Sequence, residues 1–273
     1  MDPRLQRRVQ RYGWDKAAAH YEAYWARNLA PAQEKLLEMA ELQPGERVLD
    51  VACGTGLVTL PAAERVTSTG FVFATDISQK MIERVLEEAR KAGSSWVEVA
   101  RLEAEALRWE GEPFDAALCA LGLMYVPDPA LALSQVHQHL KSGGRAVSAV
   151  WGRRDRCGWA EIFPIVDAHV ESEVCPLFFQ LGTGGAQAQA FRDAGFDEVL
   201  NERFASTLHH ASEEEALGAA FAGGPVALAY SRFDDATRDA VHAEYLRSIA
   251  PYRTGDRFEI PGEFVITRGV RKP

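Results

Sequence analysis

Between residues 44 and 152 the hydrophobic pattern alternates between two kinds of segment. Short apolar runs are separated by longer stretches in which apolar residues recur every three or four positions. The short runs predict five strands, at residues 47–51, 70–76, 95–101, 114–120 and 144–151. Strands that alternate with helices indicate a parallel sheet covered on both faces. Its ligand crevice is expected at the carboxyl ends of the strands.

Two of the intervening helices carry boundary signals. In the first, Ser78 is a suitable N-cap and Gly93 a suitable stop. The apolar face of this helix consists of Ile77, Met81, Ile82, Val85, Leu86 and Ala89. The second helix begins with Asp128 and Pro129, a cap followed by a proline, and is expected to end at the glycine pair 143–144.

The flanking segments add helices and two further strands. Residues 1–40 are expected to be helical, with Trp14, Tyr21 and Trp25 on one face. Residues 153–194 hold a helical stretch followed by a loop rich in Gly and Gln. Further along the chain we expect strands at 198–208 and 264–271, with helical segments near 212–222 and 234–249 between them.

No linker is long or polar enough to separate an independent domain. The sequence therefore predicts one α/β domain over residues 1–273, in which a Rossmann-like, doubly wound, mainly parallel sheet carries a helical cap. The core sheet is assigned to residues 44–152, 195–209 and 262–273, and the cap elements to residues 1–40, 153–194 and 210–260.

The overall composition supports a globular protein that does not bind nucleic acid. Hydrophobic residues make up 47% and charged residues 25% of the chain, which is ordinary for a soluble domain. The formal charge is −9, and an acidic surface repels phosphate backbones. The basic cluster of Arg4, Arg7, Arg8 and Arg11 is interpreted as the solvated face of a terminal helix.

Targeting signals and cysteine spacing point to the cytoplasm and to no membrane contact. The N-terminus lacks the apolar region of a signal peptide. The longest apolar run, residues 116–126, is too short to span a bilayer. The four cysteines form no Cys-x-x-Cys pair, so we expect reduced thiols and no zinc site.

Candidate chemistry is concentrated in the turn after the first strand, VLDVACGTG. Gly54 and Gly56 let the backbone approach a ligand and point helix N–H groups at it. Thr59 departs from the third position of the dinucleotide pattern G-x-G-x-x-G, and the lysine of a phosphate-binding P-loop is absent. Asp76 ends the second strand, where a carboxylate can accept hydrogen bonds from both ribose hydroxyls.

With these residues in place, the sequence resembles the class I S-adenosylmethionine-dependent methyltransferases. The resemblance covers residues 44–152 and rests, in order, on VLDVACGTG, ATDISQKM, RLEAEAL, FDAALCALGLMYVPDP and LKSGGRAVSAVWG. The N-terminal pattern WDKAAAHYEAYW is similar to that of the ubiquinone and menaquinone type of small-molecule enzymes. The resemblance implies a seven-stranded sheet whose last strand, 264–271, is antiparallel. It also implies S-adenosylmethionine as cofactor and S-adenosylhomocysteine as product.

The resemblance also implies roles for individual residues. Around the methionine portion of the cofactor it places Asp50, Ala52, Gly54, Gly56 and Leu121. Asp76 corresponds to the ribose carboxylate, and Ile77 and Met81 correspond to the apolar residues beside the adenine. Glu103 stands where the family usually has an Asp that accepts from the adenine amino group, with the backbone of Ala104 beside it. Core packing explains Ile77 and Met81 equally well.

No catalytic residue follows from the sequence. Methyl transfer is an in-line displacement in which the protein aligns the nucleophile and excludes water, and a general base is needed only when the acceptor arrives protonated. His169, His209 and His210 lie in cap segments where each could serve as a base. The segment 120–123 after the fourth strand carries no carboxylate, so we expect metal-independent chemistry.

The acceptor is expected to bind at an aromatic mouth. Its candidate lining is Trp14, Tyr21, Trp25, Tyr125, Trp151 and Phe178. Such a mouth suits a small, mostly apolar or aromatic metabolite methylated on O, N or C. The same residues could instead form the core between cap and sheet. The alternatives to a small-molecule enzyme are a methyltransferase acting on protein or RNA, a non-catalytic nucleotide-binding regulator and, more distantly, a nicotinamide-dependent dehydrogenase.

Overall fold

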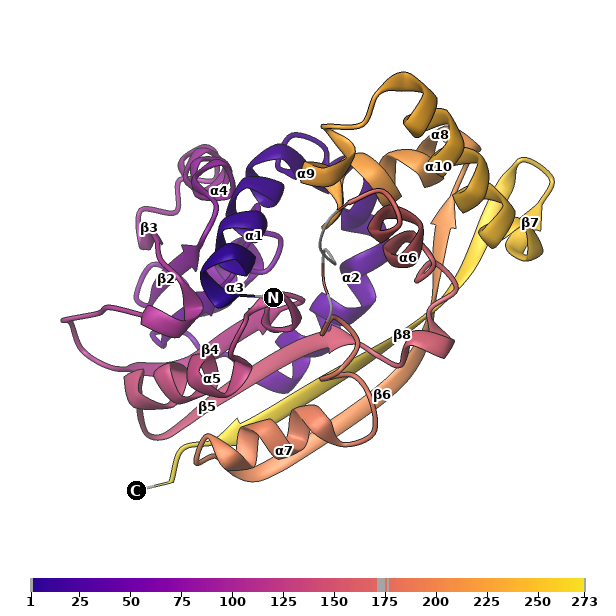
Figure 1. Cartoon of the computed structure of the whole chain (residues 1–273). Coiled ribbons are helices and arrows are strands. Elements are labelled where there is room, and N and C mark those ends of the chain that lie inside the picture. The colour runs from indigo at the N-terminus through magenta and orange to yellow at the C-terminus, as the bar shows by residue number, and fades with distance from the viewer. Residues whose placement is uncertain (1, 171–174, 176, 273) are drawn as a thin grey trace.

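All strands belong to one mixed sheet. In this computed structural model, which describes residues 2–170, 175 and 177–272, the sheet is eight-stranded with the order β3-β2-β1-β4-β5-β8-β6, and β7 pairs with β8 (Figure 1). The strands are β1 Arg47–Val51, β2 Phe71–Asp76, β3 Val97–Arg101, β4 Phe114–Ala120, β5 Leu140–Trp151, β6 Asp197–His210, β7 Arg253–Thr254 and β8 Arg257–Val270. Strands β1 to β5 pair in parallel, and β8 runs antiparallel to both β5 and β6. The predicted α/β class and antiparallel last strand are confirmed.

The apolar runs predict the central strands best. β1 and β4 have the predicted bounds, and their residues are almost entirely buried. β5 begins earlier than expected, because the chain passes directly from α5 into the strand. The glycine pair does not form a loop after the helix, since the Gly143 N–H donates to the Arg271 carbonyl and the Arg271 N–H donates to the Gly144 carbonyl.

The C-terminal strands are longer than the sequence predicted. β8 begins at Arg257 rather than at residue 264, and it passes through Pro261 and Gly262. Proline has no N–H to donate and glycine weakens a strand, so the pattern hid this half of β8. An added Cβ at Gly262 would meet the Leu208 side chain at 2.7 Å and Trp151 at 3.0 Å. The short strand β7 and its turn at Gly255 were not predicted.

Helices cover both faces of the sheet. They are α1 Pro3–Ala17, α2 Tyr21–Ala40, α3 Thr59–Val66, α4 Gln79–Lys91, α5 Pro129–His139, α6 Ile162–Asp167, α7 Ala186–Asp193, α8 Glu213–Leu217, α9 Ala227–Tyr230 and α10 Asp235–Ile249. α2 packs on β4, β5 and β8, whereas α5 and α7 pack against each other and against β5 and β8 from the opposite face (Figure 1). None of these helices, within the described residues, is long and apolar enough to cross a membrane.

The predicted helix caps are confirmed. The Ser78 hydroxyl accepts from the Met81 N–H at 3.2 Å, and the Asp128 carboxylate accepts from the Leu131 N–H at 2.9 Å. Gly93 has a φ of +68°, the left-handed conformation expected after a helix. Local capping chemistry therefore determines where α4 and α5 begin, as the sequence indicated.

Two flanking segments differ from their predicted form. The N-terminal segment is two helices, because α1 ends at Ala17 and α2 begins at Tyr21. The segment predicted as a loop rich in Gly and Gln contains α7, in which Gln187 is 1% exposed. The Gln187 amide donates to the Ser148 carbonyl at 3.2 Å, and the Thr267 hydroxyl donates to its oxygen at 3.0 Å. A polar side chain satisfied inside the core does not show in a hydrophobic pattern. Residues 171–174 and 176 of the expected cap lie outside the described residues.

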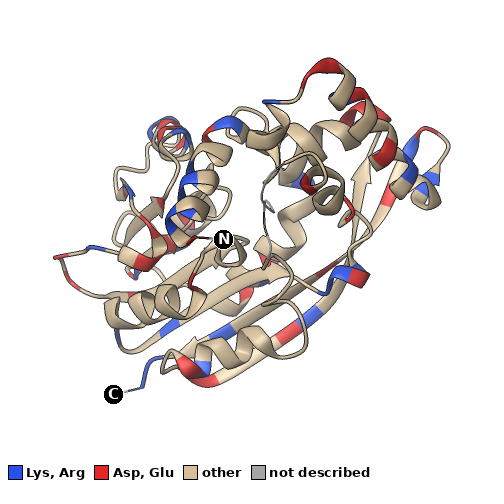
Figure 2. Cartoon of the chain, viewed as in Figure 1, with Lys and Arg blue, Asp and Glu red and all other residues tan. Residues whose placement is uncertain are grey.

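The cap helices gather over the carboxyl ends of β1, β2 and β4. α1 packs against α9 and α4, and α6 packs against α10. Figure 1 shows α1 above the sheet between α4 and α9. The basic cluster of the N-terminal region lies on α1 (Figure 2). Arg4 and Arg8 are exposed as predicted, whereas Arg7 is half-buried against Glu105 and is not part of a purely solvated face.

Candidate functional site

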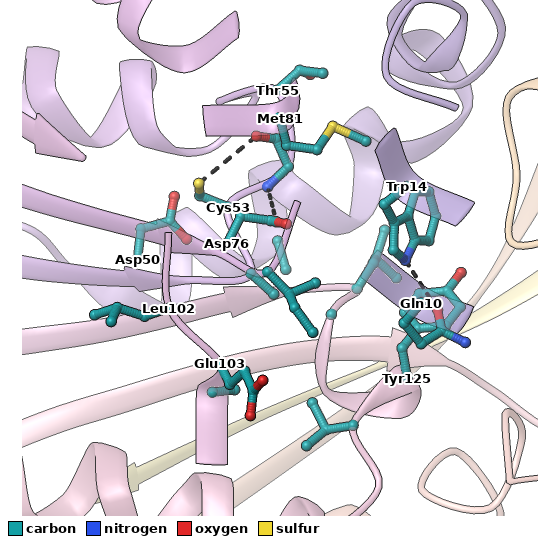
Figure 3. A pocket seen from close by; sticks show the side chains of 18 of the residues that line it. Gln10, Trp14, Asp50, Cys53, Thr55, Asp76, Met81, Leu102, Glu103 and Tyr125 are labelled. Atoms are coloured by element: carbon teal, nitrogen blue, oxygen red, sulfur yellow. Dashed lines mark hydrogen bonds between the residues drawn. The ribbon is translucent and has the colours of Figure 1, made fainter. Parts of the chain in front are cut away.

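A cavity opens beneath α1 at the carboxyl ends of β1, β2 and β4. Of the expected cofactor residues it is lined by Asp50, Ala52, Gly54, Asp76, Ile77, Met81, Glu103, Ala104 and Leu121. Figure 3 shows Asp50 and Asp76 on one side of this cavity, which we call the cofactor cavity, and Gln10, Trp14 and Tyr125 across it.

The two glycines of the turn do different things. Gly54 has a φ of +57°, and an added Cβ there would meet nothing within 4 Å, so this glycine borders open space in the cavity. Gly56 has a φ of +97°, and its added Cβ would lie 3.3 Å from a Val85 methyl group. Gly56 does not line the cavity. It lets α4 pack closely on the turn, which supports the cavity from behind.

Two non-glycine residues hold unusual backbone conformations at the cavity wall. Ala52 has a φ of +54° and Leu121 a φ of +60°. Such conformations cost of order 1–3 kcal/mol each and cluster at functional sites. The Leu121 N–H donates to the Ala149 carbonyl at 2.8 Å, which fixes the chain as it leaves β4. The same stretch brings Gly122 against Ala52, since a Cβ on Gly122 would overlap the Ala52 methyl.

Asp76 is a buried carboxylate held by backbone donors. It accepts from the Gly54 N–H at 2.9 Å and from the Ser78 N–H at 2.8 Å. Burial raises its pKa to about 6, and the Asp15 charge adds to this, although the backbone hydrogen bonds oppose the shift. Each carboxylate oxygen retains lone-pair capacity for a ligand hydroxyl. Asp76 therefore links the glycine turn to the start of α4 at the place where the sequence predicted a ribose contact.

Asp50 is fully buried and only half satisfied. One oxygen accepts from the Thr59 hydroxyl at 2.6 Å, and the other, Oδ1, has no hydrogen-bond partner among the residues that the structure describes. Burial raises the pKa of Asp50 to about 7, with a further rise from the charge of Asp76. Thr55, in the same wall, also has a buried hydroxyl without a partner. The residue that marked the departure from the dinucleotide pattern, Thr59, thus holds Asp50, a role the pattern alone did not reveal.

The sequence suggested either ligand contact or core packing for the apolar residues beside the cavity, and the structure is consistent with both. Met81 is 2% exposed and belongs to the buried face of α4, yet it also lines the cavity together with Ile77. Leu102 joins them from the end of β3. Ligand contact and core packing are therefore served by the same side chains.

Two acidic residues after β3, Glu103 and Glu105, lie close to the guanidinium group of Arg7 in α1. Glu103 lines the cavity, as expected, and lies 3.5 Å from the Arg7 guanidinium. Arg7 makes a two-pronged contact with Glu105, at 2.7 and 3.2 Å, and Glu105 also accepts from the Asp128 N–H at 3.0 Å. The hydrogen bond that Arg7 donates to Glu105 raises the pKa of Arg7. Neither Arg7 nor Glu105 was predicted, because their pairing joins residues far apart in the sequence.

Helix α1 forms a wall of the cavity. Gln10 and Trp14 line it, and the Trp14 indole N–H donates to the Gln10 side chain at 3.1 Å (Figure 3). Asp15 accepts from the Ser78 hydroxyl at 2.6 Å and from the Lys80 N–H at 3.1 Å. α1 is thus anchored through Arg7 at one end of the cavity and through Asp15 at the other.

A second hollow, which we call the acceptor slot, adjoins the first. Its lining is Trp14, Tyr21, Trp25, Leu29, Leu121, Met124, Tyr125, Trp151, Trp159, Gly223, Gly224 and Pro225. Four of these residues, Trp14, Tyr21, Leu121 and Tyr125, also line the cofactor cavity, so the two hollows share a wall. Five of the six residues expected at an acceptor mouth are brought together here.

Phe178 lies apart from the other five. Its ring is 5.3 Å from that of Tyr125 and 4.7 Å from that of Phe163. It lines a different hollow, near α6, and neither the cavity nor the slot. Phe178 supports Tyr125 from behind, in the manner of core packing. Trp159, 4% exposed and 4.9 Å from Trp151, is an aromatic slot residue that the sequence did not single out.

The histidines considered as bases lie elsewhere. His169 packs against Phe233 at 5.8 Å, and the His209 backbone is bonded to Asn28. Burial lowers the pKa of His210. None of the three histidines is among the described residues that line either hollow. Over the described ranges, no group of three or more His, Cys, Asp or Glu residues is arranged to hold a metal ion.

Comparison with known proteins places this geometry in context. Residues 48–144 match the family model described as a methyltransferase domain. The chain is 32% identical over 132 residues to aklanonic acid methyltransferase DauC of Streptomyces sp. (strain C5), a match covering 48% of this chain and 60% of that relative, less than two thirds of its length. It is 27% identical over 256 residues to nocamycin O-methyltransferase of Saccharothrix syringae, covering 89% of this chain and 91% of that relative.

A solved structure shows the same fold. The Haemonchus contortus phosphoethanolamine N-methyltransferase 2 in complex with S-adenosyl-L-methionine superimposes with a TM-score of 0.62 at 17% identity. The superposition covers 95% of this chain and 57% of that chain. At this identity the likeness concerns the fold alone.

Proposed function

We propose that this chain is a class I S-adenosylmethionine-dependent methyltransferase that moves the methyl group of S-adenosylmethionine to a small, apolar or aromatic acceptor. The match of residues 48–144 to a methyltransferase domain and the likeness to two methyltransferases support this proposal. The observation that carries this proposal is the shared wall between the two hollows. The cofactor cavity and the aromatic acceptor slot have Trp14, Tyr21, Leu121 and Tyr125 in common. A methyl group at that wall would be accessible from both sides.

The residues of the cofactor cavity fit this donor. Asp50 offers a buried, unpartnered carboxylate oxygen, and its pKa of about 7 reflects a charge buried without a cation. A ligand with positively charged groups would relieve that cost. Gly54 leaves open space beside the turn, and Asp76 retains acceptor capacity for ribose hydroxyls. Leu102, Ile77 and Met81 supply apolar surface for a purine ring.

When bound, S-adenosylmethionine supplies an activated methyl group on a positively charged sulfur. The residues of this chain then bind and orient the cofactor and the acceptor, and they exclude water from the site. Asp50 would pair with positive charge at the methionine end and Asp76 with the ribose, while Leu121 and Tyr125 form the surface across which donor and acceptor meet. Helix α1 closes both hollows with Trp14. Alignment in a closed site of this kind supplies much of the rate enhancement in such displacements.

The acceptor is proposed to be small because aromatic rings line the slot. Walls of this kind suit a flat ring system rather than a polymer. The residues after β4, Leu121 to Leu123, offer no carboxylate for a metal ion. We therefore propose metal-independent transfer, for which a chelator such as EDTA should leave the rate unchanged.

The test begins with the cofactor. Calorimetry should detect binding of S-adenosylmethionine and of S-adenosylhomocysteine, and the absence of both would refute the proposal. Incubation with methyl-labelled S-adenosylmethionine and a metabolite extract of the host should then label a small molecule. Label found only in protein or RNA would show instead that the acceptor is a macromolecule, and binding without any labelled product would favour a regulator.

A further inference from the structure

Within the described chain, no charged side chain lines the acceptor slot. Among the described residues that line it there is no Asp, Glu, His, Lys, Arg or Cys. The walls are six indole or phenol rings from the cap, from the turn after β4 and from β5, completed by aliphatic residues and the Gly223–Pro225 turn. A group that could take a proton from the acceptor is therefore missing from the part of the slot that the structure describes.

The two tyrosines of the slot are proton donors and not bases. Tyr21 and Tyr125 are its only titratable described residues. Burial raises the pKa of both, and the nearby charges of Asp76 and Glu22 raise that of Tyr21 further. Both phenols are thus neutral at physiological pH. Within the described chain, neither hydroxyl makes a hydrogen bond, so each remains available to a ligand oxygen.

The ionisable groups of the adjoining cofactor cavity do not replace a base. They are Arg7, Asp50, Cys53, Asp76, Glu103 and Glu105, and none lines the slot. Arg7 is engaged by Glu105. The pKa of the Cys53 thiol is raised well above its usual value, chiefly by burial. Asp50 and Asp76 lie in the cofactor cavity, bonded to Thr59 and to the glycine turn.

A further buried donor lies in the slot wall. Trp159 is 4% exposed, and its indole N–H has no hydrogen-bond partner among the described residues. Two other slot indoles differ, since the Trp25 N–H donates to the Ala219 carbonyl and the Trp14 N–H donates to Gln10. A buried N–H without a partner is costly, and an acceptor oxygen in the slot would relieve that cost. The slot thus offers neutral donors and no anion.

This chemistry discriminates between classes of acceptor. An alkylamine enters as an ammonium ion, for which the slot has neither a carboxylate partner nor a base to free the nitrogen lone pair. An oxygen anion needs no base, and it is attracted by a sulfonium across the shared wall. Reaction of an anion with a cation removes charge, so it gains most when apolar walls replace water around the reactants.

We propose, on the basis of the function proposed above, that the acceptor is a flat, apolar molecule whose nucleophilic oxygen is already ionised in water. Carboxylates and acidic phenols or enols belong to this class. The oxygen lone pair forms the new oxygen–carbon bond as the carbon–sulfur bond breaks, and that electron pair goes to sulfur. Anion and sulfonium become a neutral ester or ether and a thioether, and no proton moves. Tyr21, Tyr125 and Trp159 hold the oxygen as neutral donors.

A set of acceptors on one ring system tests this assignment. We would compare a naphthoate, a nitronaphthol, naphthol and aminomethylnaphthalene, each with methyl-labelled S-adenosylmethionine. At pH 7 the naphthoate and the nitronaphthol should be methylated at least tenfold faster than naphthol, and the amine not at all. With naphthol, kcat/KM should rise about tenfold per pH unit until the pH reaches the pKa of naphthol itself. Methylation of the amine, or a plateau at a lower pH that reveals a base on the enzyme, would overturn the inference.

A binding measurement separates this inference from the proposed function. Nitronaphthol changes its visible absorbance on ionisation, so its state in the slot can be read without turnover beside a cofactor analogue that carries an amine in place of the sulfonium. It should bind as the anion, and Tyr125→Phe or Trp159→Phe should weaken binding severalfold. The control Tyr245→Phe removes the hydroxyl of a buried tyrosine that lines neither hollow, and it should have no effect. If S-adenosylmethionine binds but the anion does not, only this inference fails, whereas loss of cofactor binding would remove both proposals.

Discussion

Asp15 of α1 accepts a 2.6 Å hydrogen bond from the hydroxyl of Ser78, the N-cap of α4. This contact ties the helix that covers the cofactor cavity to the strand–helix turn that forms the floor of the same cavity. Arg7, two turns earlier on α1, makes the corresponding contact with Glu105. The covering helix is therefore attached at two points, each of which can be removed by one substitution.

Release of α1 should speed cofactor exchange. Arg7→Gln removes a charged hydrogen-bond pair worth about 1.5–3 kcal/mol, so the dissociation rate of S-adenosylhomocysteine should rise about tenfold or more. Stopped-flow displacement measures this rate. Arg8→Gln is the matched control, because Arg8 lies on the exposed side of α1 and pairs with no carboxylate within the described chain. Equal effects of the two substitutions would mean that the overall charge of α1, and not the contact with Glu105, controls exchange.

Asp76→Ala should weaken cofactor binding. The substitution removes hydrogen bonds between a carboxylate and the proposed ribose hydroxyls, which are worth about 1.5–3 kcal/mol, and it frees the Gly54 N–H from its partner. The Kd for S-adenosylmethionine should therefore rise about tenfold to a hundredfold by calorimetry. Asp155→Ala, an exposed carboxylate outside both hollows, provides the comparison. An unchanged Kd for Asp76→Ala would remove Asp76 from the site.

The pKa of Asp50 predicts how stability depends on pH. Its pKa is raised from 3.8 to about 7 in the folded protein, so the folded state holds this proton more tightly than the unfolded chain does. The contribution of Asp50 to stability is fully present below about pH 4 and is lost as the pH rises through about 7. Asp50→Asn should therefore gain stability relative to the parent between pH 5 and pH 8 in denaturant titrations without cofactor. A stability difference that stays constant over this range would contradict the prediction.

The same carboxylate predicts proton release on cofactor binding. Near pH 6.5 Asp50 is partly protonated without ligand, and a bound cation favours the ionised form. Binding should therefore release protons and become tighter as the pH rises through about 7. Calorimetry in buffers that differ in ionisation enthalpy measures the number of protons released. Asp50→Asn should reduce that number, and proton uptake in the parent protein would reverse the sign and refute the argument.

The packing of Ala52 on Gly122 predicts a rescue between two sites. A methyl group on Gly122 would overlap that of Ala52, so Gly122→Ala should lower stability by about 1–3 kcal/mol, as overpacking does. Ala52→Gly removes the opposing methyl and also relieves the φ of +54°. The double variant should therefore recover most of the loss in thermal unfolding. Additive effects of the two substitutions would show that they do not share this contact.

Local chemistry explains which parts of the fold the sequence could predict. The bounds of β1 and β4 follow from buried apolar runs, and the starts of α4 and α5 follow from Ser78 and Asp128, whose side chains bond to N–H groups three residues away. Long-range partners decide what was missed. The Gln187 amide is satisfied only through β5 and β8, so from the sequence alone its segment reads as a polar loop.

In the candidate site, too, local motifs could be predicted from the sequence and long-range contacts could not. Gly54 and Asp76 are adjacent in space because their strands are neighbours in a predictable sheet, and their contact follows from the motif. The contact between Arg7 and Glu105 that attaches α1 joins residues 98 positions apart, so it produces no periodic pattern in the sequence. Phe178 shows the converse difficulty. An aromatic residue in a cap segment is equally suited to lining a slot or to packing behind Tyr125, and only tertiary contacts distinguish the two.

The position of β8 has a consequence for synthesis of the protein. This strand lies between β5 and β6, yet it is made after both of them. Until residues 257–270 leave the ribosome, β5 and β6 each present an edge with unpaired backbone groups, and such edges invite pairing with other chains. The nascent protein therefore has a late window of vulnerability to aggregation, in which a chaperone that shields strand edges would increase the yield of folded enzyme.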